Sequence, residues 1–170
     1  QKEVINHKTG EKTSEVRNVL IESARIARGS VECTSKLQAN EYDMLLIPGG
    51  LGVAKNLSDL FSPNKIAVLP DIVRIIKEFH SAKKPIGAVC ISPALVVAVL
   101  GYVEVTIGDD SSGLVKKLGG KHVVCKTREH HFDKQNNIYS CSAYMRNDSL
   151  YNVYLGISDM IDSIMMSFNK

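Results

Sequence analysis

The chain has 170 residues, of which 44% are hydrophobic and 23% are charged, and its formal net charge is +3. This composition is typical of one ordinary globular domain and excludes a disordered chain, a fibrous repeat and a small disulfide scaffold. The basic residues are scattered, and the longest apolar stretch, Cys90 to Val103, is too short and too interrupted to cross a membrane. We therefore expect a soluble protein with no nucleic-acid or membrane partner.

The first part of the chain predicts a short extended segment, a turn and a helix. Glu3–Asn6 is extended and His7–Gly10 has the chemistry of a turn. From Glu15 to Arg28, apolar residues recur at spacings of three and four, and Gly29 stands where a C-cap residue would. Packing of this apolar face is the simpler interpretation. The alternative is that the charged side chains of the helix line a cleft: Glu22, Arg25 and Arg28.

The rest of the chain alternates strands with helices. Strands are expected at Asp43–Ile47, Pro85–Val89, Val103–Ile107, Val123–Thr127 and Ile138–Cys141. Helices are expected at Asp71–His80, Pro93–Leu100, Ser112–Leu118 and Asp148–Phe168. Short connections between alternating elements imply βαβ units with parallel pairing. The predicted fold class is α/β, with an open, mostly parallel sheet sandwiched by helices.

The four cysteines, Cys33, Cys90, Cys125 and Cys141, show neither a CxxC pair nor the spacing of a secreted scaffold. We interpret them as reduced thiols in a reducing compartment. Cys33 and Cys141 have no predicted helix N-terminus nearby and are interpreted as packing residues. The chain begins at Gln1 with neither an initiator methionine nor a signal-type segment, which indicates that it starts partway through a longer protein.

Pro48-Gly49-Gly50-Leu51-Gly52 follows a predicted strand, at the position where open parallel sheets bind ligands. Its glycines let the backbone turn sharply and present bare amides, which can hold an anion. The segment lacks the Lys-Ser/Thr of a phosphate loop and the spacing of a dinucleotide fingerprint, so nucleotide binding is disfavoured. Taken alone, Gly-Gly after a strand is more often a tight turn without a ligand.

Gly87-Ala88-Val89-Cys90-Ile91-Ser92-Pro93 has the pattern of a nucleophile elbow, a strained strand-to-helix turn with small residues two positions before and after the reactive one. Ala88 and Ser92 meet this demand around Cys90, and Pro93 suits a first helical turn. We expect the sulfur near a helix N-terminus, where amides and the dipole favour the thiolate. The alternative is a buried structural cysteine.

The histidines are weaker candidates. His130 and His131 could ligate a metal together with Cys125, but adjacent residues on a strand point to opposite faces. A solvated loop is therefore the preferred interpretation, and no metal site is predicted. His80 closes an apolar helix, where a positive charge is favourable.

Several segments closely resemble one known family. They are Arg17–Gly29, Pro48–Gly50 running into Ala54–Leu57, Lys84–Ala94, Thr106–Gly108 and Ala143–Met145. Over essentially its whole length the chain resembles the ElbB (enhancing lycopene biosynthesis protein) branch of the PfpI-like, class I glutamine amidotransferase-like superfamily.

The resemblance implies a flavodoxin-like, doubly wound sandwich in which residues 1–170 form a single class I glutamine amidotransferase-like domain. It implies Cys90 as the nucleophile and the backbone amides of Gly50 and Ile91 as an oxyanion hole, with Gly49 and Asn56 beside them in substrate binding. It also implies the absence of a cofactor, a homodimer, and a cytoplasmic location, or the mitochondrial matrix in a eukaryote.

The sequence departs from the family pattern in three places. The family's first strand and following turn, which supply an acidic residue beside the cysteine, have no counterpart here, so the domain is expected to lack them. Active relatives place a histidine shortly after the elbow helix, where this chain has Thr106-Ile107-Gly108-Asp109. A Cys-His dyad is therefore not expected. Ser92 replaces the branch's Ala, and Cys141-Ser142 replaces its Thr-Pro; neither change should break the fold.

Two functions follow from this interpretation. In the first, the Cys90 thiolate adds to a small dicarbonyl such as glyoxal or methylglyoxal, and an acidic residue shuttles the proton to give a hydroxy acid, as in a glyoxalase-like lyase. Glutaminase activity is disfavoured because no His-x-Glu follows the elbow. In the second, the protein is a non-catalytic stress-response or redox-sensing protein in which Cys90 is oxidised reversibly.

Overall fold

The structure is a computed structural model that describes residues 1–64 and 66–169. It divides into two compact units, Gln1–Leu37 and Gln38–Lys170. The grouping of all 170 residues into one domain that lacks its first strand stays a prediction.

The first unit holds a bridged turn and a short helix. Ile5 and Lys12 form an isolated antiparallel bridge around the predicted turn. Helix α1 spans Val19–Ala27 and is followed by the 3-10 helix η1, Thr34–Lys36.

Helix α1 begins four residues later than predicted because the Asn18 side chain caps it, accepting the N–H groups of Leu20 and Ile21 at 2.9 and 3.2 Å. It ends at Arg28, whose backbone is left-handed. No residue of Val19–Ala27 is buried, so the packing of its apolar face stays a prediction.

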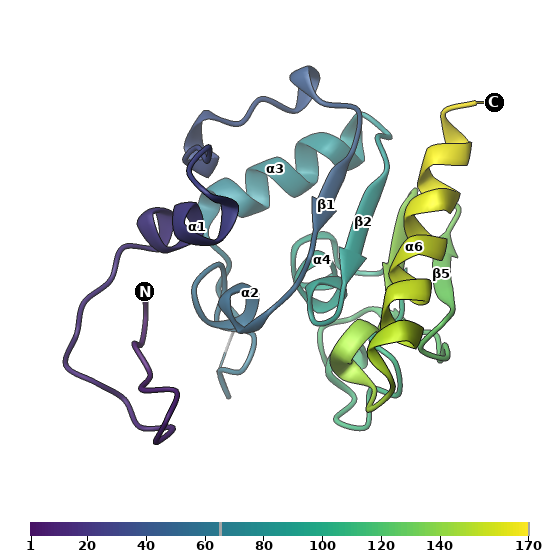
Figure 1. Ribbon diagram of the computed structural model, residues 1–170. Helices are drawn as coiled ribbons and strands as arrows, with labels where there is room; N and C mark the ends of the chain where they lie inside the picture. Colours follow the sequence, from purple (N-terminus) through teal and green to yellow (C-terminus); the bar gives the residue numbers. More distant parts are fainter. Residues whose placement is uncertain (65, 170) are drawn as a thin grey trace. The chain divides into compact units, whose positions relative to one another are not determined.

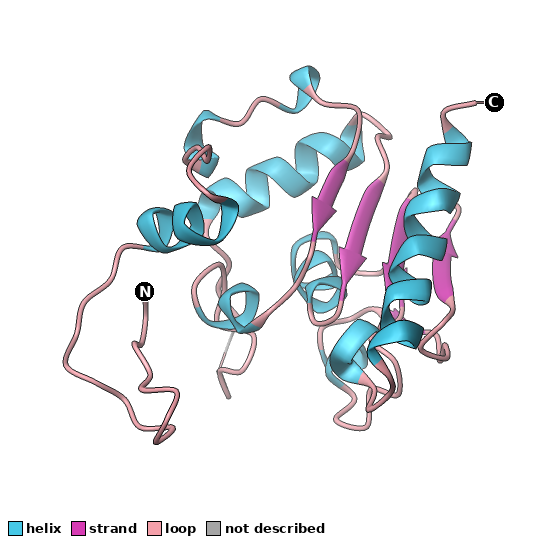
Figure 2. Ribbon diagram, viewed as in Figure 1, coloured by secondary structure: helices cyan, strands magenta, loops and turns pink. Residues whose placement is uncertain are grey.

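The second unit is built on a four-stranded sheet in the order β1-β2-β6-β5 (Figures 1 and 2). The strands are β1 (Leu45–Ile47), β2 (Ile86–Val89), β5 (His130–Asp133) and β6 (Ile138–Cys141). β1, β2 and β6 are parallel, and β5 is antiparallel to β6. Leu46 lies opposite Gly87, and Ala88 lies opposite Ser140. This topology confirms the mostly parallel α/β fold.

Helices cover both faces of this sheet. α3 (Pro70–Ser81) and α4 (Ser92–Leu100) lie on one face, and α6 (Leu150–Ser167) lies on the other (Figure 1). Shorter helices occupy the connections: α2 (Leu51–Lys55), α5 (Leu114–Lys117) and the 3-10 helices η2 (Ala39–Glu41) and η3 (Ala143–Met145). The four helices predicted in this unit are confirmed to within two residues. α2 was not predicted, because five residues are too few to show a helical period.

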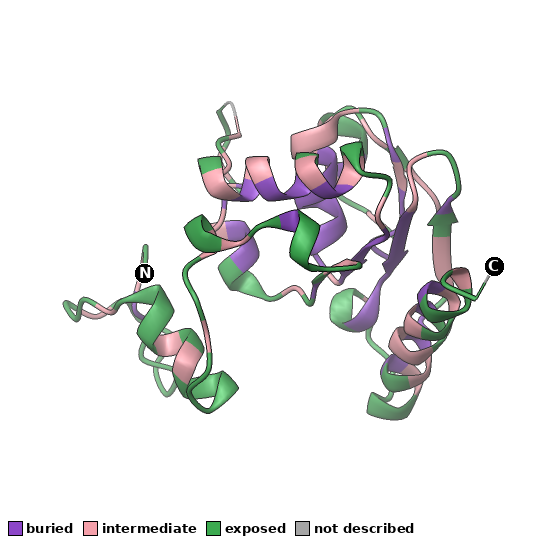
Figure 3. Cartoon of the chain, turned by 90° about the horizontal axis from the view of Figure 1, so that it is seen from above, coloured by how far each residue is buried: buried purple, intermediate pink, exposed green. Residues whose placement is uncertain are grey.

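The core lies between these layers, where the buried residues gather around the sheet (Figure 3). Every residue of β2 is buried, which explains its continuous apolar sequence. α4 buries six consecutive residues from Ser92 to Val97, as expected of a helix enclosed by protein on most sides. α6 buries one stripe only: Val153, Gly156, Met160 and Ile164.

A second sheet of two parallel strands, β3 (Glu104–Val105) and β4 (Lys121–His122), corrects one prediction. The strand expected at Val123–Thr127 is wrong. The Val123 N–H still donates to the Val105 carbonyl, but β3 offers no further partner, and Val124 is exposed. The β-branched side chains favoured a strand, whereas the length of the neighbouring strand decided where pairing stops.

Strand β5 corrects another prediction, since His130 and His131 lie on it rather than in a solvated loop. The turn that follows it makes a hairpin with β6. Asp133 Oδ1 accepts the N–H groups of Gln135 and Asn136, both at 3.1 Å, and Asn137 has a left-handed backbone. Side chain to backbone bonds of this kind form tight turns that a search for glycine and proline misses.

Candidate functional site

Cys90 lies directly after β2, in a left-handed backbone conformation with φ of 63°. Its N–H donates to the Cys141 carbonyl at 3.0 Å, so the last pairing of β2 with β6 fixes this turn. Helix α4 begins two residues later, at Ser92. Ala88 and Ser92 are both completely buried, which leaves no space for larger side chains. The backbone thus has the strand-turn-helix geometry expected of an elbow, with the sulfur partly buried at its apex.

The turn after β1 lies against this elbow. A Cβ atom on Gly49 would stand 2.7 Å from the Val89 carbonyl oxygen and 2.9 Å from the Cys90 Cβ. Gly49 also has φ of 97°, which strains any other residue. Glycine is therefore required here both for the turn and for the close approach of two strand ends.

Gly50 and Ile91 line the same cavity as Cys90. In the part of the chain that the structure describes, neither of their backbone N–H groups donates to a protein acceptor. Amides that stay unpaired beside a nucleophile can stabilise a developing oxyanion. The oxyanion-hole role itself stays a prediction.

The cavity has a volume of about 480 Å³ and lies at the carboxyl ends of β1, β2 and β3, the position expected in a sheet of this kind. Its lining consists of Gly50, Leu51, Phe61, Cys90, Ile91, Ile107, Asp109, Asp110, Ser111, Ser112, Leu114 and Met145.

Two carboxylates in this lining were missed from the sequence. Asp110 uses both oxygens at the start of α5, accepting the N–H groups of Leu114 and Val115 at 2.8 and 3.1 Å. Asp109 accepts a hydrogen bond from the Arg146 guanidinium, whose Nε also donates to the Cys125 carbonyl at 2.8 Å. Among the described residues, the second oxygen of Asp109 has no protein partner. Their position after a predicted strand was the available signal, because ligand-binding residues follow strands in this fold.

Asn56 lies apart from this constellation. It is the C-cap residue of α2 and does not line the Cys90 cavity. Gly49 does not line the cavity either, but it contacts the elbow from behind. The structure therefore brings Cys90, Gly50 and Ile91 together, and the binding role of Asn56 stays a prediction.

The other cysteines differ from Cys90 in their surroundings. Cys141 is completely buried, and burial raises the pKa of its thiol to about 12. Burial also raises the pKa of the Cys125 thiol. Cys33 is exposed, so the prediction that it packs in a core is wrong. It precedes the surface helix η1, where its sulfur accepts a hydrogen bond from the Ser35 hydroxyl at 3.2 Å.

The two adjacent histidines point to opposite faces of β5, as strand geometry predicted. His130 Nδ1 bonds Asp159 of α6, whereas His131 Nε2 lies 3.5 Å from a Glu104 carboxylate oxygen. Burial lowers the pKa of His131. His80, in the last turn of α3, lies 3.1 Å from the Asn136 side chain. Among the described residues, no three metal-ligating side chains gather, and no helix has the length and apolarity to cross a bilayer.

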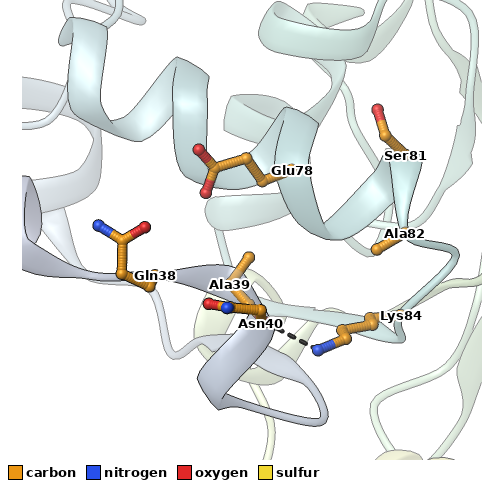
Figure 4. A pocket seen from close by; sticks show the side chains of 7 residues that line it. All are labelled: Gln38, Ala39, Asn40, Glu78, Ser81, Ala82 and Lys84. Carbon is orange, nitrogen blue, oxygen red and sulfur yellow. Dashed lines mark hydrogen bonds between the residues drawn. The ribbon is translucent and has the colours of Figure 1, made fainter.

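A larger hollow of about 600 Å³ lies at the opposite, amino end of the strands, between η2 and α3 (Figure 4). Lys84 extends across it, and its Nζ donates to the carbonyl oxygens of Ala39 and Tyr42 at 2.8 and 2.6 Å. This lysine therefore holds η2 against the end of α3.

Comparison with known proteins gave matches over nearly the whole chain. The profile described as the DJ-1/PfpI family matches residues 12–106. The chain is 40% identical to the ES1 protein homolog, mitochondrial, of Rattus norvegicus, over 97% of this chain and 67% of that protein. It is 39% identical to the glutamine amidotransferase-like class 1 domain-containing protein 3, mitochondrial, of Homo sapiens, over 97% and 66%. The chain thus spans about two thirds of the length of these relatives.

Among solved structures, an isoprenoid biosynthesis protein with an amidotransferase-like domain from Ehrlichia chaffeensis superimposes with a TM-score of 0.92. The two sequences are 58% identical, and the match covers 98% of this chain and 78% of that one.

Proposed function

This chain belongs to the DJ-1/PfpI family, and within it we propose a cysteine-dependent, cofactor-free enzyme that converts small dicarbonyls, such as glyoxal and methylglyoxal, to hydroxy acids. The observation that carries this proposal is Cys90 itself. It is held in a left-handed turn on a cavity whose lining includes two residues, Gly50 and Ile91, with backbone amides that have no acceptor among the described residues.

The chemistry begins at the sulfur. The Cys90 thiolate forms a bond to the aldehyde carbon, and the C=O electron pair becomes an alkoxide that the Gly50 and Ile91 amides stabilise. Protonation of the alkoxide gives a hemithioacetal. A carboxylate then removes the C–H proton beside sulfur, and the neighbouring carbonyl oxygen takes up a proton, which gives an enediol. The carboxylate returns its proton to the neighbouring carbon while the hydroxyl on the sulfur-bearing carbon loses its proton and becomes the C=O of a thioester. Water attacks the thioester, the C–S bond breaks, and the products are a 2-hydroxy acid and the free thiolate.

Asp109 is the described residue that best fits the proton transfer. It lines the cavity, and one of its oxygens has no partner among the described residues, whereas Asp110 uses both oxygens to begin α5. Arg146 holds Asp109 from behind and is a positioning residue. Its side chain packs across Gly108, where a Cβ atom would stand 3.1 Å from the Arg146 Cγ.

A second candidate function is reversible oxidation of Cys90 in a stress-response or redox-sensing protein. It is favoured by the absence of histidine from the described lining of the cavity, since an imidazole is the usual base beside a catalytic cysteine.

We further propose that the chain is an ElbB-like member of its family. The motifs around Cys90 and the likeness to the Ehrlichia isoprenoid biosynthesis protein support this assignment. We place the protein in the cytoplasm, or in the mitochondrial matrix if the source is a eukaryote. The second location is supported by the two mammalian relatives, which are both named as mitochondrial proteins.

The same proposal covers the oligomeric state of the protein and the strand that would extend the sheet beyond β1. We expect a homodimer that has no nucleic-acid or membrane partner. The free edge of β1 in the described sheet is where the family's first strand would pair, because that edge has unpaired backbone groups.

The test is consumption of methylglyoxal by the full-length protein and by its Cys90→Ser variant, with Cys33→Ser as the matched control. We expect turnover to vanish in Cys90→Ser and to stay within about twofold in Cys33→Ser, since a serine hydroxyl without a base is a poor nucleophile. If the protein consumes no dicarbonyl but Cys90 oxidises at low peroxide, the redox function replaces the enzymatic one. Activity that survives Cys90→Ser would exclude both.

A further inference from the structure

The lining of the Cys90 cavity is mainly apolar, and part of it is unusually exposed. Leu51, Phe61 and Met145 contribute large apolar side chains to it, although they are 67%, 55% and 41% exposed. Such residues contribute little to a core from these positions. Exposed apolar side chains that gather around one cavity mark a ligand surface.

The charged part of the lining has one sign. Asp109 and Asp110 contribute carboxylates, Ser111 and Ser112 contribute hydroxyls, and no lysine or arginine is among the lining residues described. Arg146 stands behind Asp109 and is already bonded to it and to a backbone carbonyl. A ligand with its own carboxylate would lose water and meet two carboxylates without a cation to pair with.

The volume adds a third observation. At about 480 Å³, the cavity lies within the range of roughly 300–1,000 Å³ that accommodates drug-sized ligands. A dicarbonyl of two or three carbons would leave most of it filled with water. A substituent on the carbonyl compound would reach the apolar lining and displace that water.

We propose that the Cys90 cavity selects uncharged carbonyl compounds that carry an apolar substituent, such as an aryl group, over compounds that carry a carboxylate. Phe61 is the residue that determines the preference for the substituent, because it is the aromatic residue of the described lining and its side chain is largely exposed. The inference rests on the proposed function only in taking Cys90 as the group that the ligand approaches.

A labelling experiment tests the selection without turnover. The full-length protein is treated briefly with N-phenylmaleimide or N-methylmaleimide, and separately with iodoacetamide or iodoacetate, and the rates at Cys90 and Cys33 are followed by peptide mass spectrometry. Cys33 is exposed and serves as the internal reference that cancels intrinsic reagent differences. Two ratios of labelling rates are compared between Cys90 and Cys33: N-phenylmaleimide to N-methylmaleimide (phenyl-to-methyl) and iodoacetamide to iodoacetate (amide-to-acetate). We expect each ratio to be about tenfold higher at Cys90 than at Cys33, equivalent to about 1.4 kcal/mol.

Variants separate the two preferences. Phe61→Ala should lower the phenyl-to-methyl ratio at Cys90 to that of Cys33 and leave the amide-to-acetate ratio unchanged, whereas Asp109→Asn should lower the amide-to-acetate ratio. Tyr102→Ala is the matched control, since Tyr102 is an aromatic residue 71% exposed that does not line the cavity. Ratios at Cys90 no higher than those at Cys33, or a Cys90 that reacts with none of the reagents, would overturn the inference.

Turnover distinguishes this inference from the proposed function. We expect kcat/KM for phenylglyoxal to exceed that for methylglyoxal by about tenfold. The Cys90→Ser variant corrects for the direct reaction of phenylglyoxal with arginine. If no dicarbonyl is consumed but the labelling ratios are higher at Cys90 than at Cys33, the proposed function is wrong and the selectivity stands. If methylglyoxal is consumed but the ratios are equal at the two cysteines, only the selectivity is wrong.

Discussion

The two ends of the parallel sheet differ in how far their polar groups are hydrogen-bonded within the protein. At the carboxyl end, Cys90 occupies a left-handed turn, and the described structure gives the amides of Gly50 and Ile91 no acceptor. At the amino end, Lys84 donates to two carbonyl oxygens, and Asp133 accepts four hydrogen bonds, from Glu104, Gln135 and Asn136.

The difference shows which end keeps capacity for a ligand. Left-handed residues occur at both ends, with Lys83 and Asn137 at the amino end, so the unpaired amides make the difference. Unpaired amides cost stability and persist only where the surrounding structure holds them. Bonded groups at the amino end stabilise the fold and leave little with which to bind anything else. Changes at the carboxyl end should therefore affect mainly reactivity, with one exception, whereas changes at the amino end should affect stability alone.

That exception, Gly49, carries the largest expected effect on stability. Gly49→Ala should lower the free energy of unfolding by about 3 kcal/mol, because the added Cβ meets Val89 and Cys90 and the backbone is left-handed. Gly50→Ala is the matched control, with φ of 93° but open space around the added atom, and should cost about 1 kcal/mol. Urea unfolding followed by circular dichroism measures both. Equal losses would show that the elbow does not depend on the close approach at Gly49.

Asp133 gives the next largest effect, and it depends on pH. Burial raises the pKa of this carboxyl. Hydrogen bonds from the Glu104 N–H, from the Asn136 side chain and from the N–H groups of Asn136 and Gln135 together lower the pKa by more than burial raises it, so the pKa lies below its ordinary value. Its stabilisation is therefore full above the ordinary value of 3.8 and is lost as the pH falls through the lower pKa of the folded state.

Asp133→Asn should accordingly cost about 2 kcal/mol near neutral pH and less in acid, where the native carboxylate is itself becoming protonated. Unfolding curves at about pH 6 and about pH 3 compare the two proteins. Cys90 should be alkylated at the same rate in both, because Asp133 lies at the other end of the sheet. A penalty that stays constant with pH would contradict the role of the charge.

Lys84→Met should lower the free energy of unfolding by about 1.5 kcal/mol, since two backbone carbonyls lose a charged donor. Lys83→Met removes the same charge from the neighbouring, exposed position and should cost under about 0.5 kcal/mol. Thermal unfolding of both variants checks the difference. A change in Cys90 labelling in Lys84→Met would break the separation between the two ends.

Cys90→Ser should have the smallest effect on stability, about 0.5 kcal/mol or less, because the side chain keeps its size in the partly buried turn. The same change should abolish any thiol-dependent turnover. The melting temperature is expected to shift by no more than a few degrees. A loss of several kcal/mol would instead indicate that Cys90 serves mainly in packing.

The sequence predicted the elements that have a local pattern. β2 is a buried apolar run, α3 has a clear helical period, and the small residues around Cys90 mark the elbow. Gly50 and Ile91 beside Cys90 were implied by the resemblance to the family and not by these patterns, and the structure has both residues in the Cys90 cavity.

The remaining features depend on partners far away in the chain. β5 exists because it pairs with β6 after a turn built by Asp133, and β4 ends early because β3 is only two residues long. The exposed position of Cys33 and the place of Asn56 outside the cavity likewise required the packed structure.

By itself, the sequence determined the class of fold and the position of Cys90 at the turn between strand and helix, because periodicity, glycine and residue size act over a few neighbouring residues. Only the tertiary structure decided which groups share the cavity with that sulfur. Asp109, Phe61 and Met145 come from connections that follow different elements, and Arg146 reaches Asp109 across 37 residues. No local pattern encodes such contacts, since they arise only when the strand ends converge and their loops fill the same space.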